Sequence, residues 1–173
     1  MKGHHKGNIS SWMLALLVSV SPLTQADTDV EFSGILVADP CEVHPDSLDQ
    51  IVDFRNIPSK TFINHDRPAP KRFSIRLKEC DLTLGTEVSV TFKGTEDIDQ
   101  TGMFAVTGTA KGIAIALESA SGEIIKPGVA MQPAGLVTGD TQLNYLAYVS
   151  GPDHSKVREG DFESTVFFFL EYQ

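Results

Sequence analysis

Basic residues are scarce in this sequence, and long apolar runs are missing. The 173 residues include 14 Lys and Arg against 23 Asp and Glu, which gives a net charge of -9. Nucleic-acid binding needs clustered cations to neutralise phosphates, so a nucleic-acid partner is excluded. The apolar stretch at residues 12–20 has nine positions, whereas a membrane-spanning helix needs about 20. The hydrophobic content of 41% is typical of a folded domain and argues against disorder.

The first 26 residues have the pattern of an export signal. Lys2 and Lys6 make the amino end positive, the apolar stretch 12–20 follows, and residues 24–26 include the small side chains that signal peptidase requires. We expect export of the chain and cleavage after residue 26. The mature chain then has no transmembrane segment.

Cysteine is also rare, since the chain has only Cys41 and Cys80. In the oxidising compartment that export reaches, we expect the two to pair. The disulfide would close a loop of about 40 residues and stabilise the fold by about 4 kcal/mol in the chain-entropy model. The alternative is a metal site with two thiols, but there is no CxxC pair, and His44 is the only histidine near either cysteine in sequence. We therefore predict no metal and no cofactor.

The rest of the chain reads as short strands separated by turns. No stretch keeps a helical period for ten residues, whereas apolar and polar residues alternate repeatedly. Glycine and proline mark turns between these stretches, as at Gly122 and at Pro127-Gly128. An antiparallel all-β sandwich is the predicted fold class. The predicted strands are residues 30–36, 50–54, 73–77, 88–92, 112–117, 143–149 and 162–172.

The carboxyl end has an unusual strand pattern. Counting back by twos from Tyr172, the residues are mostly apolar, so one face of a strand over 162–172 is apolar almost to the end of the chain. Monomeric proteins usually protect an exposed strand at the edge of a sheet from pairing with another chain by charged residues, by proline or by keeping the strand short. This strand has no such protection. It is either an edge that takes up another chain or a central strand of a complete sandwich. Phe167 and Phe169 have the opposite parity and would point outward, unless a bulge turns one of them in.

The amino end of the mature chain, residues 27–39, has a complementary pattern. Its members of one parity are Thr28, Val30, Phe32, Gly34 and Leu36. A free arm of this kind adds as a strand to an exposed sheet edge, where its backbone supplies affinity and side-chain pockets supply register. Gly34 would let the backbone of the arm come close to the groove. The alternative is that the arm is the first strand of its own sheet.

Several motifs resemble those of a known protein family. They are Phe32-x-Gly34 followed by Pro40-Cys41, then Phe73-x-Ile75-x-Leu77-x-x-Cys80, and finally Gly160 at the fourteenth position from the terminus with a penultimate Tyr172. Over the whole mature chain, the sequence resembles the pilins of chaperone–usher fimbriae. Further segments are similar to the K-type pilin, the minor adaptor at the base of the P-pilus tip fibre; these are residues 90–96, 112–117, 126–128, 137–139 and 160–163.

The resemblance implies an incomplete immunoglobulin-like sandwich that lacks its last strand. The implied organisation is a signal peptide over residues 1–26, a donor-strand extension over 27–39 and a pilin domain over 40–173. The alternating residues of the extension would be the donor strand. The resemblance also implies a periplasmic chaperone whose basic residues bind the carboxylate of Gln173. The implied acceptor groove and chaperone-binding site consists of Gly160, Phe162, Ser164, Val166, Phe168, Leu170, Tyr172 and Gln173.

The implied function is that of a structural minor subunit or adaptor, which polymerises by donor-strand exchange and contributes to pilus assembly and cell adhesion. Its partners would be a periplasmic chaperone, the outer-membrane usher and neighbouring pilins, and its destination would be the cell-surface fimbrium. The alternatives are the major rod pilin of such a fimbria and a secreted carbohydrate-binding sandwich. An enzyme is not indicated, because the sequence has no nucleophile elbow, phosphate loop or HExxH motif.

Overall fold

The computed structural model describes residues 29–173. Its contacts divide the chain into a unit that ends at Leu36 and a second unit, Val37–Gln173. The predicted signal segment at residues 1–26 and Thr28 of the predicted arm lie outside the described residues. Within the described part of the chain, no helix is long and apolar enough to cross a membrane.

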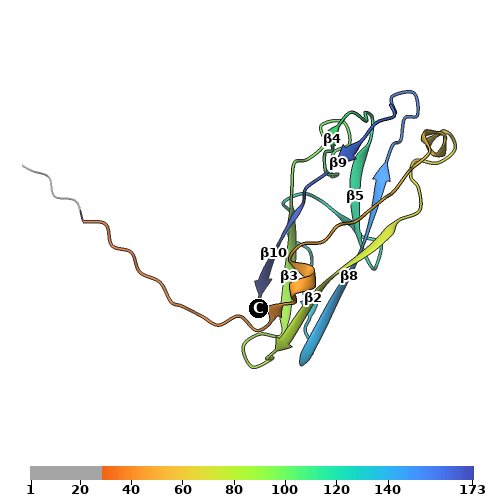
Figure 1. The fold of residues 1–173 in the computed structure, drawn as a ribbon. Coiled ribbons are helices and arrows are strands. Elements are labelled where there is room, and N and C mark those ends of the chain that lie inside the picture. The colour runs from red at the N-terminus through yellow and green to blue at the C-terminus, as the bar shows by residue number, and fades with distance from the viewer. Residues whose placement is uncertain (1–28) are drawn as a thin grey trace, which may run out of the picture. The chain divides into compact units, whose positions relative to one another are not determined.

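The second unit contains two main antiparallel sheets that face each other (Figure 1). The larger sheet has the order β1 (Glu42–Val43), β2 (Lys71–Cys80), β8 (Gly139–Ser150), β5 (Ala114–Ser119) and β6 (Ile124–Ile125). The smaller sheet has the order β10 (Phe167–Tyr172), β3 (Glu87–Lys93) and β7 (Ala134–Gly135). A separate ladder joins β4 (Thr107–Gly108) to β9 (Phe162–Glu163), and the connections include the 3-10 helices η1 (Pro45–Ser47) and η2 (Ser59–Ile63). The prediction of an all-β sandwich is confirmed.

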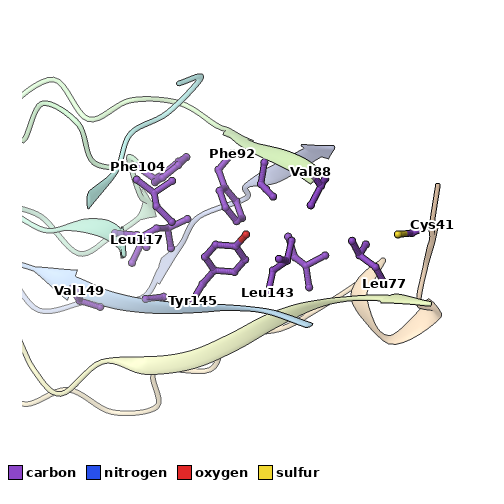
Figure 2. Close-up of a cluster of buried hydrophobic side chains, with 14 of the residues drawn as sticks. Cys41, Leu77, Val88, Phe92, Phe104, Leu117, Leu143, Tyr145 and Val149 are labelled. Atoms are coloured by element: carbon purple, nitrogen blue, oxygen red, sulfur yellow. The ribbon is translucent and has the colours of Figure 1, made fainter. Parts of the chain in front are cut away.

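Strand alternation builds the core between the two sheets. In β8, Leu143 and Tyr145 are buried whereas Gln142 is exposed, which is the period of two expected of a half-buried strand. Figure 2 shows these inward side chains meeting Val88 and Phe92 of β3. The rings of Tyr145 and Phe92 lie edge to face, with centroids 5.0 Å apart and planes at 82°. This geometry is favoured between aromatic rings and adds to the burial of both side chains.

A disulfide joins Cys41 to Cys80, as predicted. Both cysteines are buried at the end of the core. Next to them, the ladder between β1 and β2 places Glu42 opposite Lys78, and the Lys78 ammonium lies 2.8 Å from the Glu42 carboxylate. The start of the sandwich is therefore held on β2 by a covalent bond, a short ladder and an ion pair.

Two glycines allow β4 and β9 to approach closely. Gly108 and Gly160 have positive φ angles of 114° and 158°. A Cβ atom on Gly160 would lie 2.5 Å from the backbone nitrogen of Ala110, and one on Gly108 would overlap the carbonyl oxygen of Asp161. The N–H groups of Thr109 and Ala110 donate to that same oxygen at 2.9 and 3.1 Å. Both space and backbone conformation therefore favour glycine at these positions.

Not every predicted strand forms. Residues 29–39 and 50–54 contain no strand, and the predicted strand 162–172 is divided between β9 and β10. Alternating side chains are not sufficient for a strand, because the backbone groups also need a paired neighbour. The division of 162–172 occurs where the Ser164 hydroxyl donates to the backbone oxygen of Ala105 at 2.8 Å. The other predicted strands are present, with boundaries shifted by a few residues.

Candidate functional site: a groove beside the last strand

β10 has a neighbouring strand on one side only. It pairs with β3, and no strand within residues 29–173 pairs with its other edge. Gln173 and Glu87 exchange both backbone hydrogen bonds, at 2.9 and 3.2 Å. Hydrogen-bonded and non-hydrogen-bonded pairs alternate along antiparallel strands, so the backbone groups of Phe168, Leu170 and Tyr172 point to the free edge. This edge therefore offers an unpaired row of donors and acceptors.

Side chains along residues 161–172 alternate between the core and the surface. The even-numbered positions are half-buried, and the odd-numbered positions are exposed. Phe167 and Phe169 are 62% and 47% exposed, and the Lys93 ammonium lies 4.2 Å from the centroid of the Phe169 ring. Phe168 and Leu170 instead pack against the core. The residues with free backbone groups are thus also those with inward apolar side chains.

Residues 49–58 form the opposite wall of the site. Val52, Phe54 and Ile57 are half-buried and pack against the core, whereas Ile51 is 91% exposed. Residues 51–57 make no backbone-to-backbone hydrogen bond within the described part of the chain. The wall therefore has the side-chain pattern of a strand without a ladder on either side.

An apolar groove of about 1810 Å³ lies between these two walls. The two walls come together where the rings of Phe54 and Phe162 have centroids 6.2 Å apart. At the carboxyl end of β10, the Tyr172 hydroxyl donates to the backbone oxygen of Cys41 at 3.3 Å. An apolar space beside an unpaired edge is what a missing strand leaves in a sandwich. The floor of the groove includes Phe73, Ile75, Phe92, Ile115, Leu117 and Val149.

The groove offers unpaired backbone groups and hydrophobic surface. Burial raises the pKa of Tyr145 in the core, and burial followed by the negative charge of Asp39 raises the pKa of Tyr172. Both phenols therefore remain uncharged at neutral pH. Within residues 29–173, no three His, Cys, Asp or Glu side chains are grouped so as to hold a metal ion.

The predicted donor residues that the structure describes lie in the first unit, and Thr28 is outside the described residues. Val30 and Leu36 have exposed side chains, and Phe32 is 92% exposed. Apart from the two residues next to it in the chain, nothing lies within 4 Å of the place that a Cβ atom would occupy on Gly34. The arm therefore presents its apolar side chains to solvent in this structure.

The structure brings most of the predicted acceptor residues to one wall of the groove. Gln173 is the exception, since its backbone oxygen accepts hydrogen bonds from the N–H groups of Thr86 and Glu87 at 2.8 and 3.2 Å. The sequence pattern does not identify the wall at 49–58, although the alternation of 50–54 predicts a strand there. The predicted residues that line the groove are Gly160, Phe162, Ser164, Val166, Phe168, Leu170 and Tyr172.

Comparison with known proteins agrees with this geometry. The family model described as Fimbrial protein matches residues 30–173. The chain is 33% identical to the Fimbria A protein of Serratia marcescens over 150 residues, which cover 86% of each chain. It is 35% identical to the fimbrial adapter PapK of Escherichia coli over 175 residues, 95% of this chain and 98% of the relative. A solved structure of a chaperone–usher pilus has a TM-score of 0.70 at 25% identity, covering 89% of this chain and 100% of that one.

These similarities extend over nearly the whole described chain and include both walls of the groove. The incomplete immunoglobulin-like sandwich predicted from the sequence is confirmed. The chain belongs to the fimbrial protein family, and it is a structural subunit of a fimbria.

Proposed function

We propose that this chain is a minor, adaptor-type subunit of a chaperone–usher fimbria that assembles by donor-strand exchange. The observation that carries the proposal is the apolar groove of about 1810 Å³ beside the unpaired edge of β10. We assign the chain no catalytic role and no cofactor.

An incoming strand would complete the sandwich through both its backbone and its side chains. Its backbone would pair with the free groups of Phe168, Leu170 and Tyr172 on one side and with residues 51–57 on the other. Its inward side chains would fill the groove, each contributing roughly 1.5–3 kcal/mol before the cost of ordering. The same strand therefore gains a two-sided ladder and a hydrophobic core.

The arm at residues 27–39 is the proposed donor for a neighbouring subunit. Its apolar residues alternate as groove binding requires, and the described ones are exposed. The arm of each chain would enter the groove of the preceding one, so the contact joins two different surfaces. Such a head-to-tail contact does not close on itself and extends into a fibre.

A periplasmic chaperone and the outer-membrane usher are the proposed assembly partners. An open apolar groove favours aggregation, so a strand lent by the chaperone would cover it during passage through the periplasm. The signal segment at residues 1–26 accounts for export, and the carboxylate of Gln173 would bind basic residues of the chaperone. At the usher, the arm of the next subunit would replace the chaperone strand.

The role as a minor adaptor subunit is supported by similarity to PapK over almost the full length of both chains. A rod subunit would occur in many copies per fibre, whereas an adaptor occurs in few. Quantitative mass spectrometry of purified fimbriae measures this ratio. A copy number equal to that of the most abundant pilin would exclude the adaptor role, while the chain would remain a structural subunit of the fimbria.

Substitutions at the two ends test the division between donor and acceptor. Phe32→Asp should block insertion of the arm into the preceding subunit and leave chaperone binding unchanged. Phe168→Asp should abolish chaperone binding, because it places a charge in the groove. Co-purification with the chaperone and polymer formation in vitro measure the two steps.

Phe167→Asp is the matched control for this test. It introduces the same charge on the same strand, but at an exposed position. We expect chaperone binding to survive in this variant. Loss of chaperone binding in Phe32→Asp, or equal loss in the Phe167 and Phe168 variants, would contradict the proposed assignment.

A further inference from the structure

The rims of the groove carry mainly negative charge. Asp49 and Asp53 lie on one wall, and Glu159, Asp161 and Glu163 lie on the other, all exposed. No salt bridge within residues 29–173 involves any of these five carboxylates. The cations that line the groove are Arg55 and Arg158. A strand that enters the groove therefore passes between two predominantly acidic rims.

The arm of this chain is itself acidic. Residues 27–39 contain Asp27, Asp29, Glu31 and Asp39 and no lysine or arginine. If Val30 and Phe32 point into a groove, Asp29 and Glu31 point outward, because successive side chains of a strand alternate. The outward face of the donor strand is thus acidic as well.

These two sets of charges would lie on the solvent-facing side of the filled groove. Asp53, Asp161 and Glu163 are exposed residues of the two walls, and the outward residues of an inserted strand also face solvent between those walls. This holds whether the strand runs parallel or antiparallel to β10. Like charges on neighbouring strands are destabilising. The apolar side chains of a second copy of this arm therefore favour its binding in the groove, whereas the charge of the rims opposes it.

We infer that the groove selects its donor strand by charge and rejects the arm of a second copy of this chain. The strand that it accepts has the same apolar alternation but carries lysine or arginine at outward positions. This inference rests on the proposed donor-strand function and adds the chemistry of the partner. The subunit inserted here is accordingly a different chain, and self-polymerisation is suppressed.

Synthetic donor peptides test the inference. The full chain carrying Phe32→Asp, whose own arm cannot insert, is refolded with a labelled peptide of residues 27–39. A second peptide carries Asp29→Lys and Glu31→Lys, and a third carries Phe32→Asp. Fluorescence anisotropy measures the Kd of each at about 20 mM and about 500 mM NaCl, where charge screening is weak and strong respectively.

We expect the lysine peptide to bind about tenfold more tightly than the unmodified one at low salt, with the difference shrinking at high salt. In a full chain that also carries Asp161→Lys and Glu163→Lys, the order of the two peptides should reverse. Binding of the unmodified peptide to that variant also shows that it folds. The Phe32→Asp peptide should not bind to either chain.

The outcomes separate the inference from the proposed function. Equal affinity of the first two peptides at both salt concentrations, or an unchanged order in the rim variant, would overturn selection by charge and leave strand insertion standing. Failure of both apolar peptides to bind at any salt concentration would overturn strand insertion itself.

Discussion

Gly160 and Gly135 differ in their surroundings, which allows a test by single substitutions. A Cβ atom on Gly160 would lie 2.5 Å from the backbone nitrogen of Ala110, whereas one on Gly135 would meet nothing within 4 Å apart from its two neighbours in the chain. Gly160→Ala would push β9 away from β4, so we expect it to lower the free energy of unfolding by about 1–3 kcal/mol. Gly135→Ala should stay within about 0.5 kcal/mol of the unsubstituted chain. Urea unfolding of the peptide-bound chain measures both, and equal effects would contradict the packing argument.

Within β10, neighbouring backbone amides face different partners. The N–H groups of Phe169 and Glu171 are directed to β3, whereas those of Phe168 and Leu170 are directed to the free edge. Without a donor strand, we expect the second pair to exchange hydrogen with solvent much faster than the first. Donor binding should slow the second pair and residues 51–57 and change the first pair less. Pulse-labelled hydrogen exchange with fragment mass spectrometry distinguishes these amides.

The peptide carrying Phe32→Asp is the control for this exchange experiment. It should leave all the rates of β10 unchanged, since it lacks the central apolar side chain. Slow exchange at both Phe168 and Phe169 before any donor is added would show that the edge is already paired. That result would remove the structural basis of the groove.

Local patterns predicted those elements whose partners lie in the same chain. Alternation located the residues of β2, β3 and β8, and export predicted the Cys41–Cys80 disulfide. The same alternation at 50–54 did not produce a strand, because the ladder that would hold it is missing from the described structure. The apolar residues at every second position also predicted that residues 162–172 line one wall of the groove. The opposite wall and the acidic rims depend on tertiary proximity between distant segments, which no local pattern contains.

The groove beside β10 has room for one more strand than residues 29–173 provide. β10 ends at Tyr172, one residue before the end of the chain, and its free edge runs back along the groove. A strand appended after Gln173 through a short Asn-Gly turn would return antiparallel along this edge. The chain would then carry its own donor and would no longer need a neighbour for its stability.

This design predicts a change in both stability and association. We expect a chain with Phe32→Asp in its arm, and with an appended copy of residues 28–36 carrying Asp29→Lys and Glu31→Lys, to be a soluble monomer. A matched chain whose appended copy also carries Val30→Asp and Phe32→Asp should aggregate, since its groove stays open. With several apolar side chains seated, the thermal midpoint should rise by at least about 10 °C over that of the matched chain. Light scattering and calorimetry measure both properties, and a soluble monomeric control with the same midpoint would show that the sandwich is complete without a donor strand.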